Sequence, residues 1–274
     1  MSFSLNTRTD AWVRTFQRRT SPAINLVCLP PAGCAASFYR AWGAELPADI
    51  AVRAVQYPGR EDRFGETPID EMAAMAEAVT EAVRPLFDLP VVLFGHSMGA
   101  SIAYEVARRG EGDGRVPALF IASGHPAPHH RDPRRVHTGT DDELVAELRR
   151  YPDNGAGVLD SPELRELLLP AVRADYKLIE TYELRHPAPI PAPVAVLRGV
   201  DDPDVDADKA AAWGDLAPGG ALCARHDFPG GHFYLREQRS ELLRVLTGIV
   251  GEQVRRPQRP GAPASGDPAA GRPR

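Results

Sequence analysis

Short apolar runs alternate along this chain with segments of helical periodicity, and this alternation restricts the possible folds more than any other feature. Several runs are almost continuously apolar, which is typical of strands covered on both faces in a mainly parallel sheet. Helices must then cross over between the strands, so we predict an α/β three-layer sandwich. Six runs have the length and composition of strands: residues 24–29, 50–57, 91–95, 118–123, 194–199 and 221–228.

Two of the intervening segments predict crossover helices, because their apolar residues recur every three or four positions. In the first segment these residues are Ile69, Met72, Met75, Ala76, Val79 and Val83. In the second they follow Gly99 and are Ile102, Val106 and Ala107. Both segments lie next to strand runs, as the helices of a parallel sheet must.

A longer helical stretch, at about residues 132–186, interrupts the alternation without containing a strand run. Ser161 suits an N-cap and Pro162 the first helical position, so we expect a helix to begin there. A helical insertion before a late strand is where such a fold carries a lid, although an extra helix pair packed as scaffold has the same pattern. The residues that would form the apolar underside of this lid are Leu167, Leu168, Val172 and Ile179.

Composition and charge narrow the class of protein. We expect one domain over residues 1–254, followed by a disordered tail at 255–274 that is rich in Pro, Gly and Arg and has little to bury. A net charge of -5, with no basic run interleaved with aromatics, argues against nucleic-acid binding. No segment is apolar enough for a signal peptide or a membrane helix, so we expect a cytoplasmic protein. Three cysteines are too few for a disulfide framework and should be reduced.

The sequence Gly95-His96-Ser97-Met98-Gly99 lies directly between a strand run and a helical pattern. This G-x-S-x-G arrangement is typical of the nucleophile elbow of the α/β-hydrolase fold, in which the serine occupies a strained turn above the sheet. Side chains in place of the two glycines would collide with neighbouring backbone. We therefore predict Ser97 as the nucleophile and expect His96 to pack beside it. A glycine-flanked turn in a noncatalytic relative would have the same sequence.

A nucleophilic serine needs an orienting acid and a base, which follow it in that order in this fold. His232 follows the last strand run in a Gly-Gly-His turn and is the predicted base, whereas His226 lies within that run, where its side chain packs. Asp201 and Asp202 both follow the preceding strand run, and either carboxylate would otherwise be a solvated turn residue. We favour Asp202, because it stands three residues past the strand-terminal glycine and Pro203 fixes the turn after it.

The oxyanion hole needs a second backbone donor besides the amide of Met98, which begins a helix behind the serine. Pro30 and Pro31 follow the first strand run and have no amide hydrogen, so Ala32 is the earliest available donor. A loop that its prolines merely stiffen is the alternative. Cys34 is expected to be a small buried hydrophobe. We predict no cofactor and no metal, since the sequence has no phosphate-binding loop and no cluster with ligand spacing.

Several stretches, in chain order, resemble the type II thioesterases that accompany polyketide synthases and nonribosomal peptide synthetases. They cover about residues 10–248 and include VQYPGREDRFGE, LFGHSMGA, SPELRELLLPAVRADYKLIETY and PGGHFYL. The resemblance implies the triad Ser97, Asp202 and His232. It also implies hydrolysis of acyl groups from the phosphopantetheine arm of an acyl or peptidyl carrier protein, often to clear stalled or misprimed chains. Cys34, where the family commonly has a second glycine, and Pro31 depart from the family pattern.

Other interpretations stay open at this point. A chain-releasing thioesterase or an esterase of the same fold would carry the same triad, and a noncatalytic binding protein would keep the fold without the chemistry. We expect a monomer that binds neither nucleic acid nor membrane. A carrier protein is usually acidic, so docking on this negatively charged chain would need a local basic cluster. The candidate clusters are Arg131, Arg134 and Arg135 before the lid, and Arg60 and Arg63 in the PGRE loop. Each cluster could equally be a solvated surface or form structural ion pairs.

Overall fold

A single sheet of seven strands carries the fold of the described residues, which are 11–130, 134–151 and 156–255 of this computed structural model. Every neighbouring pair of strands is parallel except β1 with β3. This arrangement confirms the predicted mainly parallel sheet. In their order across the sheet, the strands are β1 (Val13–Arg14), β3 (Ile50–Val55), β2 (Ile24–Leu29), β4 (Val91–His96), β5 (Leu119–Ser123), β6 (Val194–Gly199) and β7 (Ala224–Phe228).

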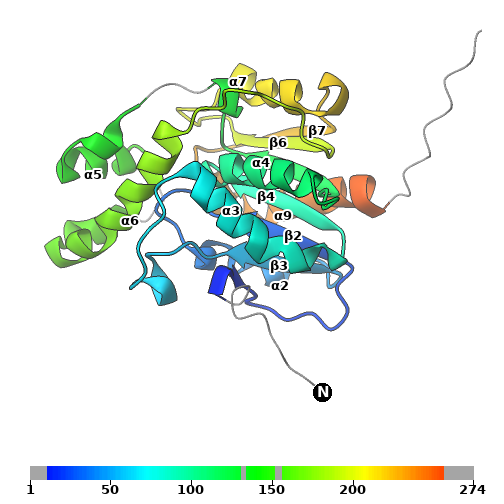
Figure 1. The fold of residues 1–274 in the computed structure, drawn as a ribbon, viewed down its shortest axis with the longest axis horizontal. Helices are drawn as coiled ribbons and strands as arrows, with labels where there is room; N and C mark the ends of the chain where they lie inside the picture. The colour runs from blue at the N-terminus through cyan, green and yellow to red at the C-terminus, as the bar shows by residue number, and fades with distance from the viewer. Residues whose placement is uncertain (1–10, 131–133, 152–155, 256–274) are drawn as a thin grey trace, which may run out of the picture.

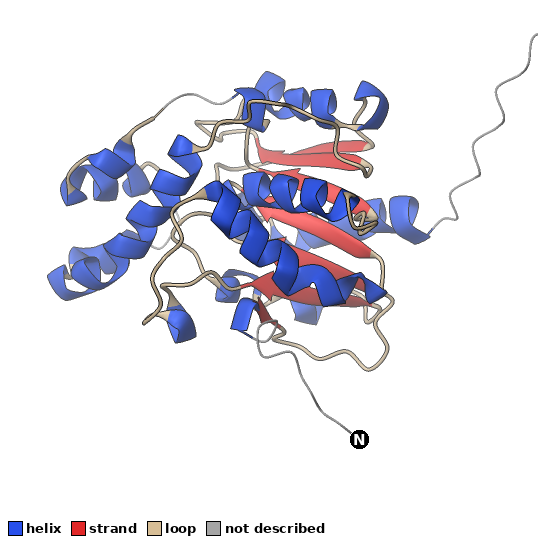
Figure 2. Ribbon diagram, viewed as in Figure 1, coloured by secondary structure: helices blue, strands red, loops and turns tan. Residues whose placement is uncertain are grey.

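Helices cover both faces of the sheet, which confirms the three-layer sandwich (Figures 1 and 2). Successive residues of a strand point to opposite faces, and each face accordingly has its own buried cluster. One face is covered by α3 (Met72–Val83), α4 (Met98–Glu111) and the short α7 (Ala207–Ala211). The other is covered by α2 (Trp42–Glu45), α8 (Tyr234–Glu237) and α9 (Arg239–Val250).

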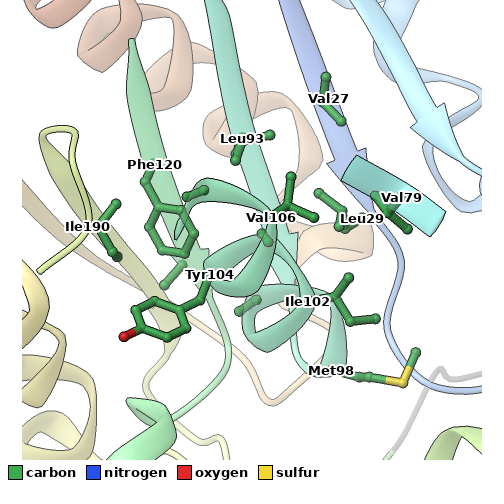
Figure 3. Packing of buried hydrophobic residues seen from close by; sticks show 14 of the residues in the cluster. Val27, Leu29, Val79, Leu93, Met98, Ile102, Tyr104, Val106, Phe120 and Ile190 are labelled. Atoms are coloured by element: carbon green, nitrogen blue, oxygen red, sulfur yellow. The ribbon is translucent and has the colours of Figure 1, made fainter. Parts of the chain in front are cut away.

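Helix α4, which follows the predicted elbow, is seated deeply against the sheet (Figure 3). Ile102 and Val106 of this helix are buried with Val27 and Leu93 of the sheet and Val79 of α3. Each apolar side chain of this size contributes roughly 1.5–3 kcal/mol when it leaves water. This packing holds the start of α4 in a fixed position relative to β4.

The strand predictions differ from the structure by more than one residue at three places. Strand β1 was missed, because two residues are too few to show any period. The run at 50–57 ends as a strand at Val55, and the run at 221–228 becomes a strand only at Ala224. None of these differences moves the carboxyl ends of β2, β4 and β6, where the predicted site residues follow.

Between β5 and β6 the chain leaves the sheet and forms two helices, α5 (Asp141–Arg149) and α6 (Pro162–Thr181), which we call the cap. They lie to the left of the sheet in Figure 1. The hydroxyl of Ser161 accepts from the amide of Leu164 at 3.3 Å, which confirms the predicted N-cap. The cap occupies the predicted lid segment, whose movement stays a prediction.

No helix within the described ranges is long and apolar enough to cross a membrane. The predicted disordered tail at 255–274 lies outside the described residues, apart from Arg255.

Candidate active site

Ser97 occupies a sharp turn between β4 and α4. Its backbone has φ 53° and ψ −126°, a conformation that residues other than glycine rarely adopt. The amide of Ser97 donates to the carbonyl of Ser123 at 2.8 Å, which ties the turn to β5. A Cβ at Gly95 would lie 2.3 Å from the carbonyl oxygen of Gly99. Only glycine therefore allows the strand and the helix to approach this closely, as a nucleophile elbow requires.

The second glycine of the elbow brings the loop after β2 against the start of α4. A Cβ at Gly99 would lie 2.2 Å from the carbonyl oxygen of Leu29. The following residues, 30–34, which we call the oxyanion loop, thereby pass beside Met98. Ala32 and Met98, the two predicted oxyanion donors, both line the same chamber as Ser97.

The oxyanion loop is a tight turn. The amide of Cys34 donates to the carbonyl of Pro31 at 3.1 Å and closes the turn, and Gly33 has φ 74°. A positive φ at the third position is the mark of a type II turn, and glycine adopts it without strain. Ala32 stands at the second position of this turn.

His232 and Asp202 meet at the same edge of the sheet. His232 Nδ1 lies 2.8 Å from Asp202 Oδ2, and the side chain of Asp202 is fully buried. The other carboxylate oxygen, Asp202 Oδ1, accepts from the amide of Asp204 at 3.0 Å. Asp201, the alternative acid, is exposed and makes its backbone hydrogen bond to Gly230. An Nδ1–carboxylate hydrogen bond leaves Nε2 of the imidazole as the basic nitrogen.

His96 is buried next to the site and has a different environment from His232. Its Nδ1 lies 2.9 Å from Ser123 Oγ, and that hydroxyl lies 2.7 Å from the hydroxyl of Tyr234. Burial, with a smaller effect from nearby His232, lowers the pKa of His96 well below its usual value. His96 is therefore neutral, and its role is to pack 5.0 Å, centroid to centroid, from the ring of His232. His226 packs on Phe228, as expected.

Ser97 and His232 open into a chamber of about 240 Å³ between the strand ends and the cap. Leu168, Val172 and Ile179 of α6 line it. Leu167 does not: its surface is 47% exposed and it faces a neighbouring groove. Consecutive helical residues are rotated by about 100°, and at this point of α6 the rotation turns Leu167 away from the chamber that Leu168 lines, so assigning Leu167 to the chamber was wrong. Sequence reasoning missed other apolar and aromatic lining residues, namely Leu148, Tyr151, Val158, Leu159, Ala171 and Tyr176.

Comparison with known proteins decides the family. Residues 24–249 match the family model described as "Thioesterase domain". The chain belongs to the thioesterase family. Its members hydrolyse thioesters, and the relatives of this thioesterase include type II enzymes of polyketide and nonribosomal peptide pathways, as the sequence resemblance implied.

Three relatives show how far the similarity extends. The probable cadicidin biosynthesis thioesterase of Streptomyces griseus is 40% identical over 82% of this chain, which spans 62% of that protein. Thioesterase PikA5 of Streptomyces venezuelae is 38% identical over 89% of this chain and 86% of its own length. The solved structure of the type II thioesterase BorB from the borrelidin biosynthetic cluster is 38% identical, with a TM-score of 0.81 over 88% of this chain and 98% of that one.

The PGRE loop of this thioesterase is not a basic docking surface. Arg60 and Arg63 are each only 7% exposed. Arg60 pairs with Asp175 of α6, and Arg63 pairs with Glu66 and lies over the ring of Trp12 at 4.2 Å. Their charges are paired within the protein, so the structural alternative holds for this cluster and the docking patch does not. These arginines are buried because α6 and the N-terminal segment pack on the PGRE loop, which the sequence of the loop alone does not reveal.

Only part of the other predicted basic cluster could contact a carrier protein. Arg134 forms ion pairs with Glu147 and Asp204, and Arg135 is exposed. Arg131 lies outside the described residues.

Two further groups have metal-binding or nucleophilic side chains. Cys34 lines the chamber, where burial raises the pKa of its thiol to about 12 and keeps it protonated. Among the described residues, His129, His130 and Asp215 could together offer three ligand atoms to a metal. None of these three lines the chamber, and His129 Nε2 already lies 3.1 Å from Asp215 Oδ2.

Proposed function

We propose that this thioesterase uses Ser97, Asp202 and His232 to hydrolyse acyl groups carried on the phosphopantetheine arm of an acyl or peptidyl carrier protein. The observation that carries the proposal is the buried Asp202–His232 hydrogen bond, because His232 lines the same chamber as the strained Ser97. The acid holds the imidazole in the tautomer whose Nε2 accepts a proton.

In the first half-reaction, Ser97 Oγ attacks the thioester carbonyl while His232 Nε2 accepts its proton. The negative charge that develops on the carbonyl oxygen is stabilised by the amides of Met98 and Ala32. When the tetrahedral intermediate collapses, the carbon–sulfur bond breaks, and the imidazolium donates its proton to the departing sulfur. The acyl group remains as an ester on Ser97.

In the second half-reaction, water attacks the acyl ester and His232 accepts its proton. The same two amides stabilise the second oxyanion. Collapse returns the proton to Ser97 Oγ and releases the free acid. Because the neutral His96 adds no positive charge beside His232, it does not oppose the imidazolium that forms in each step.

The chamber and the relatives support an acyl group on a carrier as substrate. Leu168, Val172 and Ile179 offer an apolar wall to an acyl chain, and we propose them as its contacts. The similarity to thioesterases named for cadicidin and borrelidin biosynthesis supports a role in such a pathway, where clearing stalled chains is the editing reaction. The cap, in this proposal, is the lid over the acyl chain.

Intact-mass analysis of an acylated carrier protein, before and after addition of the enzyme, tests the proposal. We expect loss of the acyl mass, and a higher kcat/KM for the carrier than for the same acyl group on coenzyme A, because contacts remote from the thioester help to position it. Equal rates on coenzyme A would indicate a general thioesterase, and hydrolysis of oxygen esters alone would indicate an esterase.

Two serine variants separate chemistry from folding in this assay. Ser97→Ala should lower the rate roughly 10³-fold or more, because the attacking oxygen is lost. Ser101→Ala is a matched control: its hydroxyl is buried one turn further along α4 without a hydrogen-bond partner in the described residues. Full activity of Ser97→Ala would refute the mechanism.

A further inference from the structure

The oxyanion loop donates a hydrogen bond to a distant part of the chain. Asp175 lies in the second half of the cap helix α6 and is fully buried. Its Oδ2 accepts from the amide of Gly33 at 2.8 Å, across 142 positions of sequence. Gly33 follows Ala32 directly, so a side chain of the cap is bonded one peptide away from a proposed oxyanion donor. The sequence showed this aspartate only as part of the cap helix.

Arg60 stabilises this contact by forming a bidentate ion pair with Asp175. Its Nη1 and Nη2 donate to the two oxygens of Asp175 at 2.7 and 2.8 Å. Nη1 also lies 3.2 Å from the carbonyl oxygen of Cys34, on the other side of Gly33. Burial alone would lower the pKa of Arg60, but the Asp175 carboxylate raises it above its usual value. Arg60 therefore stays positively charged, and the Arg60–Asp175 pair contacts the oxyanion loop at two consecutive residues, Gly33 and Cys34.

Two carbonyl groups that precede Ala32 are also held by hydrogen bonds, so the turn is fixed on both sides of Ala32. Tyr39 donates to the carbonyl of Leu29 at 3.0 Å, and Tyr57 donates to the carbonyl of Pro30 at 3.2 Å. These contacts come from the sheet side of the protein and precede Ala32. Asp175 is the contact that follows it, and it fixes the central peptide of the type II turn, whose rotation would convert the turn to another type.

From these contacts we propose that Asp175 is a positioning residue for hydrolysis: the cap's buried carboxylate holds the oxyanion loop so that the Ala32 amide reaches the developing oxyanion. This inference rests on the proposed function. Asp175 itself touches no reacting atom. Its negative charge would oppose a nearby oxyanion, and Arg60 compensates for it. The oxyanion hole is thus completed by a helix that belongs to the cap and not to the sheet.

The variant Asp175→Asn tests this role, because it keeps the shape of the side chain and an acceptor but removes the charge that fixes Arg60. We expect kcat on a small acyl thioester to fall roughly 10- to 100-fold, less than the loss of a whole oxyanion donor, with KM changed less than about threefold. The affinity for an alkylboronic acid should fall by a similar factor, because its adduct with Ser97 places an oxygen in the oxyanion hole. Thermal unfolding identifies any loss of folded protein.

Lys177→Gln is the matched control. Lys177 lies two residues further along the same helix and pairs with Asp70 on the surface, without contact to the oxyanion loop. It should keep both kcat and boronate affinity. If Asp175→Asn does not fold, Arg60→Lys replaces it: a lysine keeps the charge but cannot donate to both carboxylate oxygens and Cys34 at once, and the same paired losses are expected.

The outcomes are distinguishable. Unchanged kcat and boronate affinity in a folded Asp175→Asn protein would overturn the inference, and so would a loss of kcat that leaves boronate affinity intact. If the wild-type protein neither hydrolyses thioesters nor binds the boronate through Ser97, the proposed function fails and the inference fails with it. Parallel losses of kcat and boronate affinity, with Lys177→Gln unaffected, support it.

Discussion

The nucleophile elbow and the oxyanion loop are neighbours at one edge of the sheet, yet different interactions hold them. The elbow is fixed by backbone packing: Gly95 and Gly99 bring strand, helix and loop into contacts too close for any side chain. The oxyanion loop is fixed in part by charged side chains, through Asp175 and Arg60. The first kind of contact is made by backbone atoms, which have no other arrangement available to them at this separation. The second kind of contact joins the cap helix α6 to the oxyanion loop, so it depends on the position of the cap.

The residues on either side of the cap helix α5 also contact the loop that carries Asp202, and these polar contacts are weaker than the Asp175–Arg60 contact. Tyr151 and Arg134 both donate to the carboxylate of Asp204, two residues after the proposed acid. These groups are partly exposed, so water screens them, and exposed ion pairs contribute only about 0–1 kcal/mol each. The Asp175–Arg60 pair is buried, where removal of one partner leaves an uncompensated charge. The oxyanion loop should therefore depend more on the cap than the acid loop does.

The largest loss of kcat/KM that we predict in this comparison comes from replacing the proposed acid, Asp202. Asp202→Asn should lower kcat/KM roughly 10³- to 10⁴-fold, because an amide no longer stabilises the tautomer and charge of His232. Asp201→Asn, one residue earlier and exposed, should stay within about twofold of the wild type. Steady-state kinetics on one thioester decides, and equal losses in the two variants would remove Asp202 from the proposed triad.

The next effect tests the backbone packing of the elbow. Gly99→Ala places a Cβ 2.2 Å from the carbonyl oxygen of Leu29, so the start of α4 and the oxyanion loop must separate. We expect a loss of roughly 1–3 kcal/mol in the free energy of unfolding, as for other overpacked sites. We also expect at least a tenfold lower kcat, of the order of a partly displaced oxyanion donor.

A second glycine provides the control for this substitution. Gly248 lies in α9, and a Cβ there would meet nothing within 4 Å. Gly248→Ala should raise the free energy of unfolding by up to about 1 kcal/mol, since alanine favours the helix, and leave kcat unchanged. If Gly99→Ala behaved like Gly248→Ala, the close contact at the elbow would not matter for the site.

Residues that follow local sequence signals could be predicted, whereas contacts between distant parts of the chain could not. Ser97, Asp202 and His232 each follow a strand of a parallel sheet, and the carboxyl ends of such strands share one edge, so their meeting could be expected from local signals. Asp175 could not be paired with Gly33, because 142 residues separate them and only the packing of α6 brings them together. For the same reason the sequence could not decide whether Arg60 is a docking residue or part of a structural pair.

Two other errors have simpler physical causes. The pattern of the cap helix gave its apolar residues but not its rotation about its own axis, which decides that Leu168 lines the chamber and Leu167 does not. Strand β1 has too few residues for a period and is defined by its pairing of Val13 with Val55. In both cases the missing information is which distant surface the residue faces.

The smallest effect concerns the polar contacts between the cap and the loop that carries Asp202. Burial and the neighbouring Asp204 raise the pKa of Tyr151, so its hydroxyl stays protonated and donates to that carboxylate. Tyr151→Phe removes this bond, while Arg134 keeps its own contact with Asp204. The acid loop should then shift only slightly, because the amide of Asp204 still donates to Asp202 Oδ1 at 3.0 Å. We expect kcat/KM to fall severalfold, less than tenfold, which corresponds to under about 1.4 kcal/mol.

Tyr182→Phe distinguishes this effect from a general loosening of the cap. Tyr182 follows α6 directly and donates to Glu105 of α4 at 2.7 Å, so it also joins the cap segment to the sheet layers through a tyrosine–carboxylate bond. Both variants should lose a similar free energy of unfolding, of about 1 kcal/mol for each hydrogen bond. Only Tyr151→Phe should lower kcat/KM, because only Asp204 adjoins the loop of the proposed acid. Equal losses of kcat/KM in Tyr151→Phe and Tyr182→Phe would mean that the whole cap affects the site, and not the Asp204 contact in particular. A loss in Tyr151→Phe as large as in Asp175→Asn would mean that the acid loop depends on the cap as much as the oxyanion loop does.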